Sequence, residues 1–245
     1  MSEDSKRPAF YALAPGGWRD YWTLLHPPYT LWHLSYVAIG ASLAQEVSGR
    51  RLGESMLAFF LAVGLAAHAL DELHGRPLAT RIPDGVLWGL AVAGIGGAVA
   101  LGADGAVQVS PWMIVFIAAG GFLVVAYNLE LLGGAFHSDV WFALGWGAFP
   151  ALTGFFAQTG RVSVGAVGVA AACAAIAAAQ RTLSTPVRRL RRTVRSVEGR
   201  ITLLDGTSEP IEAPTLRAAP EAALRWASLG MVLLASGLLL SRTWR

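Results

Sequence analysis

The feature that most constrains the fold is a series of long segments without any Asp, Glu, Lys or Arg. These segments are residues 21–45, 55–70, 85–103, 105–129 and 140–160. Most of them reach the roughly 17–25 residues that an α-helix needs to cross a bilayer. Only 14% of the 245 residues are charged, whereas about a quarter are charged in a typical soluble domain. The sequence therefore predicts an all-α integral membrane protein.

We expect a bundle of about seven transmembrane helices around a lipid-accessible cavity. The predicted spans lie near residues 28–47, 54–73, 85–103, 111–132, 139–158, 162–182 and 220–241. They divide the chain into a polar N-terminal tail, a six-helix membrane core, an Arg-rich segment and a C-terminal transmembrane helix, at residues 1–20, 21–185, 186–218 and 219–245. Pro150 is expected to kink the fifth span, because proline removes a helical hydrogen bond.

The Arg-rich segment also contains a hairpin signal. Asp205-Gly206 lies between two short extended runs, and Asp-Gly is a strong predictor of a two-residue β-turn. An isolated hairpin is marginally stable in water. We therefore expect it to pack against the Arg-rich end of the sixth helix or against the bundle, with a structural or gating role.

Positive residues give the expected orientation. Seven arginines lie between Arg181 and Arg200, while Lys6 is the single lysine. Basic residues beside membrane helices favour the cytoplasmic side and contact anionic lipid. The sequence therefore predicts a multi-pass protein of the cell membrane with a cytoplasmic N-terminus, and nucleic acid is an unsuitable partner. Cys173 is the only cysteine, which excludes a disulfide framework.

Ionisable side chains gather at one predicted membrane face. The second span ends in HALDELHGRPLATRIP and the fourth in YNLELLGGAFHSD, and both ends lie on the expected cytoplasmic side. His26 and His33 begin the first span on the same side, with His26 expected to be an interfacial side chain. Charged groups at membrane depth are costly, so such a cluster indicates a functional site.

The spacing of these groups is suited to metal binding. His68, Asp71 and Glu72 share one helical face, since a helix turns every 3.6 residues or so. Imidazoles and carboxylates together can hold a divalent metal. The candidate metal ligands are His68, Asp71, Glu72, His74, Glu130, His137 and Asp139.

Several of these segments resemble a known family. HPPYTLWHLSYVAIGASLA, HALDELHGRPLATRIP and AYNLELLGGAFHSDVWFALGWGAFPALTGFFAQTG are similar to parts of the UbiA-type intramembrane prenyltransferases, over about residues 25–185. The resemblance implies a helical bundle whose two Asp-rich motifs bind a magnesium-diphosphate head group at the cytoplasmic side. It also implies transfer of a prenyl group from a polyprenyl diphosphate to a lipid-soluble acceptor.

Matching the family motifs residue by residue gives the remaining candidates. His68 stands where the first Asp of N-D-x-x-D is expected and Asp71 where the second is, and Tyr127 matches the tyrosine of the family's A-Y segment. No acid precedes Glu198 where the second Asp-rich motif is expected. The catalytic candidates are Asp71, Glu72, Tyr127 and Glu130. The substrate-binding candidates are Asn128, Arg76, Arg81 and Arg181, and arginines, including Arg188, can contact phosphate oxygens directly.

Three functions remain open from the sequence. The first is a divergent prenyltransferase that uses magnesium. The second is another membrane enzyme, acting on a lipid or quinone-like substrate, in which histidine in place of aspartate shifts the metal preference toward zinc, iron or manganese. The third is a non-catalytic subunit that binds an isoprenoid or pigment, with a possible protein partner in a membrane assembly.

Overall fold

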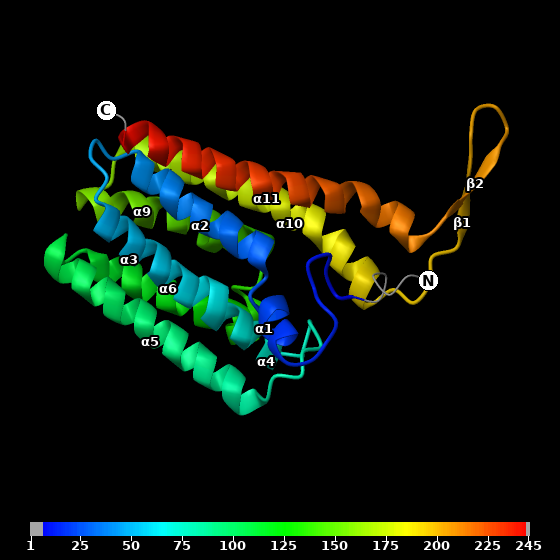
Figure 1. Ribbon diagram of the computed structural model, residues 1–245, viewed down its shortest axis with the longest axis horizontal. Helices are drawn as coiled ribbons and strands as arrows, with labels where there is room; N and C mark the ends of the chain where they lie inside the picture. The colour runs from blue at the N-terminus through cyan, green and yellow to red at the C-terminus, as the bar shows by residue number, and fades with distance from the viewer. Residues whose placement is uncertain (1–6, 244–245) are drawn as a thin grey trace.

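The computed structural model describes residues 7–243, and within them the chain is mostly helical (Figure 1). A short helix, α1 (Trp18–Leu24), precedes α2 (Pro27–Ser42). The next helical segment is continuous through α3 (Gly49–Phe59), η2 (Phe60–Ala67) and α4 (His68–Leu73). The remaining elements are α5 (Asp84–Gln108), α6 (Met113–Asn128), α7 (Leu131–Gly134), α8 (Asp139–Ala143), η3 (Leu144–Ala148), α9 (Phe149–Thr159), α10 (Val164–Arg192), β1 (Gly199–Thr202), β2 (Ser208–Ile211) and α11 (Ala213–Thr243).

Five of the described helical segments are long and apolar enough to cross a membrane. They are Gly49–Leu73, Asp84–Gln108, Asp139–Thr159, Val164–Arg192 and Ala213–Arg242. The other two long helices, α2 and α6, each contain 16 residues. At about 1.5 Å per residue they are roughly 24 Å long, shorter than a typical hydrocarbon core of about 30 Å. The expectation of a helical membrane protein agrees with this architecture.

Helix α2 packs closely against α9 because two glycines remove the side chains that would separate the backbones. A Cβ atom built on Gly40 would lie 1.8 Å from the carbonyl oxygen of Ala151. A Cβ on Gly154 would lie 2.2 Å from the carbonyl oxygen of Val37. Small residues allow such close helix contacts in membranes. These two positions therefore fix the distance between α2 and α9.

Two π-helical turns interrupt the long helices. η2 separates α3 from α4, and η3 separates α8 from α9. Pro150 follows η3 directly, within the continuous helical segment Asp139–Thr159. The kink expected at Pro150 stays a prediction, and the irregularity present is the π-helical turn before the proline. Wide turns of this kind often mark functional positions.

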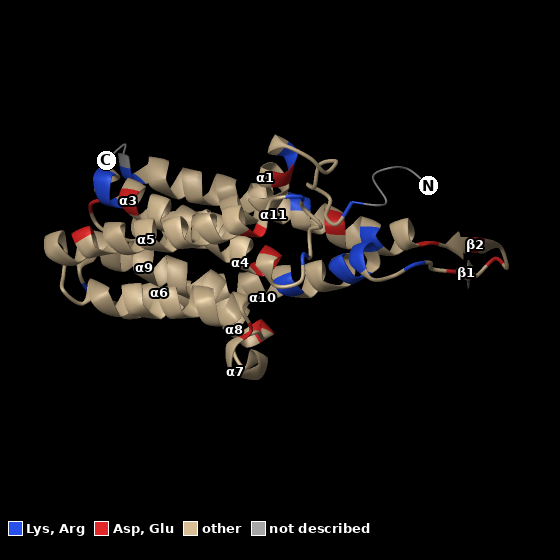
Figure 2. Cartoon of the chain, turned by 90° about the horizontal axis from the view of Figure 1, so that it is seen from below, with Lys and Arg blue, Asp and Glu red and all other residues tan. Residues whose placement is uncertain are grey.

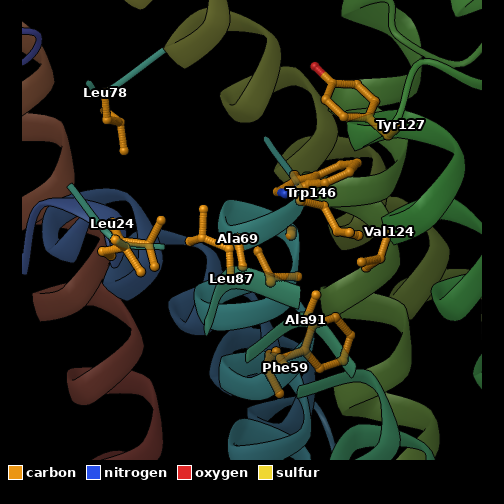
Figure 3. Close-up of a cluster of buried hydrophobic side chains, with 14 residues drawn as sticks. Leu24, Phe59, Ala69, Leu78, Leu87, Ala91, Val124, Tyr127 and Trp146 are labelled. Carbon is orange, nitrogen blue, oxygen red and sulfur yellow. The ribbon is translucent and has the colours of Figure 1, made fainter. Parts of the chain in front are cut away.

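One core cluster connects α4, α5 and α6 with η3. Its buried members include Leu70, Leu87 and Val124. Tyr127 and Trp146 lie next to each other at one side of the cluster, and the Tyr127 hydroxyl points away from the other labelled side chains (Figure 3). The cluster therefore supports these two aromatic rings from the side opposite the hydroxyl.

Charged residues lie mainly at the two ends of the helical body (Figure 2). The larger group surrounds α1, α4 and the C-terminal part of α10, and a smaller group lies around α3 at the opposite end. The middle of the body carries few charges, as expected for a protein surrounded by lipid at that level.

The predicted hairpin is present but does not pack as expected. Strands β1 and β2 are antiparallel and pair Gly199 with Ile211 and Thr202 with Ser208. All residues of β1 are exposed, and the hairpin extends away from the helices (Figure 1). The expectation of packing against the bundle is therefore wrong. The Asp205 carboxylate accepts hydrogen bonds from the N–H and hydroxyl of Thr207, at 2.9 and 2.7 Å, so the turn is stabilised locally.

Candidate functional site: a polar cavity at one end of the bundle

A cavity of about 240 Å³ lies among the N-terminal segment, the start of α2, α4, the end of α6 and the C-terminal half of α10. We call it the polar cavity. Its ionisable or hydrogen-bonding lining residues are Tyr11, His26, Tyr29, His33, His68, Asp71, Tyr127, Asn128, His137, Gln180, Arg181, Ser184, Arg188 and Arg192. The structure thus brings together four of the five histidines.

Helix α10 forms one wall of the polar cavity. Gln180, Ser184, Arg188 and Arg192 are each four residues apart and therefore lie along one side of the helix. Arg181 is adjacent and donates a hydrogen bond to Asp139, with 2.9 Å between Nε and Oδ1. Arg189 is exposed and is not among the lining residues. One face of α10 therefore supplies the positive charge of the cavity.

The charge balance of the lining is positive. Arg181, Arg188 and Arg192 contribute three cations, of which Arg181 is paired with Asp139. Asp71 is the only carboxylate among the lining residues. Guanidinium groups recognise phosphate and carboxylate groups through several parallel hydrogen bonds. The composition of the lining therefore favours an anionic ligand.

Three of the histidines are oriented by the backbone. Nδ1 of His26 lies 2.7 Å from the carbonyl oxygen of Leu24, and Nδ1 of His68 lies 3.0 Å from that of Gly64. Nδ1 of His137 lies 3.0 Å from the carbonyl oxygen of Tyr127. A carbonyl oxygen only accepts hydrogen bonds, so each neutral ring carries its proton on Nδ1 and leaves Nε2 as an acceptor.

His26 is more than an interfacial side chain. It is 8% exposed, and its ring centroid lies 4.0 Å from that of His68. Burial, and then the neighbouring His68, hold the pKa of His26 well below its usual range. The backbone at His26 is left-handed, with φ of 47°, just before Pro27 begins α2. The expected interfacial position of His26 stays a prediction, to which the structure adds its burial in the lining of the polar cavity.

Two buried polar atoms in the lining lack a hydrogen-bond partner among the described residues. They are Nδ1 of His33 and the hydroxyl oxygen of Tyr127. Both side chains are 5% exposed, and Nε2 of His33 lies 3.3 Å from the Gln180 Oε1 atom. Buried polar atoms without partners are rare in proteins and indicate a place for a ligand or water.

The N-terminal segment covers part of the polar cavity. Nε of Arg192 donates to the carbonyl oxygen of Pro8 at 3.3 Å, and Nη1 of Arg191 donates to that of Arg7 at 3.2 Å. The Arg225 guanidinium lies 4.9 Å from the centre of the Phe10 ring. Burial raises the pKa of the neighbouring Tyr11 phenol well above its usual value. Arginines of α10 and α11 thus hold this segment in place.

Glu72, a catalytic and metal-binding candidate from the sequence, lies outside the polar cavity. It is fully buried, and one carboxylate oxygen accepts from the Leu78 N–H at 2.9 Å. The other accepts from the N–H and the hydroxyl of Thr80, both at 2.8 Å. These hydrogen bonds hold the loop 74–83 against α4 and indicate a structural role for Glu72.

The other candidates outside the lining belong to smaller polar contacts. Glu130 lies 3.8 Å from both His74 and His137 and is 44% exposed. The Arg76 guanidinium contacts Asp84. The backbone N–H of Arg81 donates to Asp20 at 3.1 Å.

The predicted set of seven metal ligands does not converge. Among residues 7–243, no three His, Cys, Asp or Glu side chains are arranged to hold a metal ion. Glu72 accepts a hydrogen bond from Leu78 in the loop 74–83, and Asp139 accepts one from Arg181. A magnesium-diphosphate centre built on several carboxylates therefore does not fit the lining of the polar cavity, in which Asp71 is the single acid.

A second, apolar cavity of about 100 Å³ adjoins the first. It lies among α3, η2, α5, α6, η3 and α9, and its lining includes Phe59, Ile117 and Phe149. Trp146 lines both cavities, so one residue contacts both a basic compartment and an apolar one.

The sequence predictions missed several lining residues. The sequence predicts His26 and His33 near this face but outside the set of site residues, and that set lacks Tyr29, Gln180, Ser184 and Arg192. The four-residue spacing from Gln180 to Arg192 was a usable signal for the α10 wall. No local pattern indicates that the N-terminal segment reaches the cavity, because this contact spans most of the chain length.

Comparison with known proteins identifies no relative of this chain. No protein-family model, curated protein or solved structure matches this chain.

Proposed function

We propose that this protein is a divergent intramembrane prenyltransferase of the UbiA type. In this proposal all seven long helices cross the membrane, with α2 and α6 accommodated by local thinning of the bilayer. The polar cavity opens toward the cytoplasm, since the arginines of α10 favour that side. It binds the diphosphate of a polyprenyl diphosphate, and the prenyl group is transferred to a lipid-soluble acceptor.

The observation that carries this proposal is the arginine-lined wall of α10. Arg181, Arg188 and Arg192 line one cavity, and the lining contains a single carboxylate, that of Asp71. Asp139 balances Arg181 from outside the lining, but Arg188 and Arg192 are costly to hold together at the edge of a membrane unless an anion balances them. A diphosphate supplies both the charge and the acceptor oxygens that guanidinium groups prefer.

The chemistry follows from this charge. Prenyl transfer breaks the allylic C–O bond, and its electron pair leaves with the diphosphate. Arginine side chains stabilise the charge that develops on the leaving oxygens, as cationic clamps do in other phosphoryl chemistry. The resemblance would assign this role to magnesium, but the described side chains do not form the required carboxylate set, so the proposal relies on arginine alone.

The adjoining apolar cavity supports a lipid substrate. A prenyl tail passing Trp146 would contact Phe59 and Phe149 while its head group stays among the arginines. Pockets of mainly apolar surface with a few polar anchors are typical of ligand sites. The ligand that matches both cavities has an anionic head and an apolar tail.

The test measures binding of geranylgeranyl diphosphate to protein in lipid nanodiscs. Arg188→Gln removes one cation from the lining, whereas Arg189→Gln removes a neighbouring, exposed arginine. A hydrogen bond to a charged group contributes about 1.5–3 kcal/mol, so Arg188→Gln is expected to weaken binding about 10- to 150-fold. Arg189→Gln keeps the wild-type affinity. Absence of binding to the wild type, or equal loss in both variants, would contradict the proposal.

A further inference from the structure

Transfer to an acceptor that carries a proton also releases that proton, and four histidine rings line the polar cavity. His68 is positioned by local backbone geometry. It follows the π-helical turn η2 directly, and its backbone N–H donates to the Leu65 carbonyl. Its Nδ1 lies 3.0 Å from the carbonyl oxygen of Gly64, one turn earlier. The ring is thus fixed on a helix rather than on a loop, which favours precise placement.

The bond to Gly64 also determines where the proton resides. The carbonyl accepts from Nδ1–H, and the neutral imidazole then has an unprotonated Nε2. A backbone or carboxylate partner on one ring nitrogen is the usual way in which proteins prepare the other as a base or ligand. His68 lines the polar cavity, where a substrate can reach it.

The surroundings of His68 distinguish it from the other histidines. Asp71 lies three residues later in α4 and lines the same cavity. His26 is more deeply buried, and Tyr127 stacks on His137 with ring centroids 4.5 Å apart. The other titratable or charged groups that line this cavity are Tyr11, His26, Tyr29, His33, Tyr127, His137, Arg181, Arg188 and Arg192.

We propose that His68 is the proton acceptor of the polar cavity, held as the Nδ1–H tautomer with Nε2 free. This proposal rests on the proposed prenyl transfer. As the allylic C–O bond breaks and the acceptor forms its bond to the prenyl carbon, the proton released by the acceptor moves to Nε2 of His68. The imidazolium returns its proton to water when the products leave. His68 thereby stands where the UbiA-type motif has an acid, but with a different role.

The first test determines the tautomer without any reaction. ¹⁵N NMR of histidine-labelled protein in nanodiscs at neutral pH is compared with His68→Gln to assign the signals. The expected result is a protonated Nδ1 and an unprotonated Nε2 for His68. A proton on Nε2 in the neutral ring, or a ring that carries both protons at neutral pH, would overturn the proposal.

The second test measures transfer. His68→Gln keeps a polar side chain of similar reach but cannot accept a proton near neutral pH. General-base catalysis contributes about 10²- to 10⁴-fold, so the variant is expected to lose at least about 100-fold in transfer rate while its affinity for geranylgeranyl diphosphate changes less than about threefold. The transfer rate of the wild type is expected to fall at acidic pH. The residual transfer rate of His68→Gln is expected to lack this fall.

The outcomes separate the two proposals. If the wild type transfers prenyl groups and His68→Gln transfers them at a similar rate, the role of His68 is wrong and the proposed function stands. If the wild type binds no geranylgeranyl diphosphate and transfers nothing, the proposed function fails together with the role of His68. Loss of affinity in His68→Gln equal to its loss of rate would assign His68 to ligand binding and overturn the proton-acceptor role.

Discussion

The imidazole rings of His26 and His68 lie with their centroids 4.0 Å apart inside the polar cavity. His26 comes from the residue just before α2 and His68 from the start of α4, so this contact joins two helical segments. Two protonated rings at this distance would repel each other. The contact is therefore stable only while at least one ring, and by its burial His26 first, is neutral.

This relationship predicts a stability that falls at acidic pH. Burial and the neighbouring His68 depress the pKa of His26 in the folded protein, while the unfolded chain binds a proton near the ordinary value of about 6.5. The unfolded state thus binds more protons below about pH 6.5, and the free energy of unfolding decreases there, by at most about 1.4 kcal/mol per pH unit for one group. Above that pH the contribution is constant.

The measurement is unfolding of wild type and His26→Asn between pH 5 and 8. Asparagine tolerates the left-handed backbone of this position but does not titrate in this range. The variant is expected to show a smaller decrease in stability below about pH 6.5. Equal pH profiles for the two proteins would show that His26 is not held neutral.

A second prediction concerns Glu72. Its two carboxylate oxygens accept three hydrogen bonds from Leu78 and Thr80. Glu72→Gln places an NH₂ group opposite one of these donors, and a buried donor without a partner costs about 1–3 kcal/mol. The variant is expected to unfold at lower denaturant concentration and to be cleaved faster by protease in the loop 74–83.

The control for this prediction is Glu209→Gln on the exposed strand β2, which should leave stability within about 0.5 kcal/mol of the wild type. If Glu72→Gln were as stable as the wild type and yet bound no polyprenyl diphosphate, Glu72 would belong to the functional site after all.

A third prediction tests the contact between α2 and α9. Gly40→Ala places a methyl group where the Ala151 carbonyl oxygen now lies, so the two helices must separate. Overpacking of this kind costs about 1–3 kcal/mol, occasionally more. Gly96→Ala on α5 is the matched control, because a Cβ atom there has no neighbour within 4 Å. This variant is expected to gain up to about 1 kcal/mol from helix propensity, and thermal unfolding in detergent measures both effects.

Much of the helical architecture could be predicted from the sequence because it depends on local properties. Charge-free segments located the long helices, and Asp205-Gly206 located the turn between β1 and β2. The position of the hairpin could not be predicted in this way. Its contacts depend on where α10 ends and α11 begins in space, and the exposed strands have no apolar face that would specify a partner.

Part of the site could also be predicted, because it depends on local sequence patterns. The ends of α4 and α6 contain dense polar patterns, which indicated His68, Asp71 and Tyr127, all now in the lining. Glu72 belongs to the same pattern, but its environment is decided by how the following loop folds back onto it. Likewise, the π-helical turn that orients His68 has no sequence signature as distinct as a cap or a proline.

The last prediction tests the orientation of the bundle in the membrane. In a Cys173→Ser background, Leu204→Cys places a thiol at the exposed hairpin turn and Val162→Cys places one in the loop between α9 and α10. Because arginines favour the cytoplasmic side, a membrane-impermeant thiol reagent should label Leu204→Cys in inverted vesicles and Val162→Cys in intact cells. Labelling of Leu204→Cys from intact cells alone would place the polar cavity outside the cytoplasm, where a cytoplasmic polyprenyl diphosphate does not reach it.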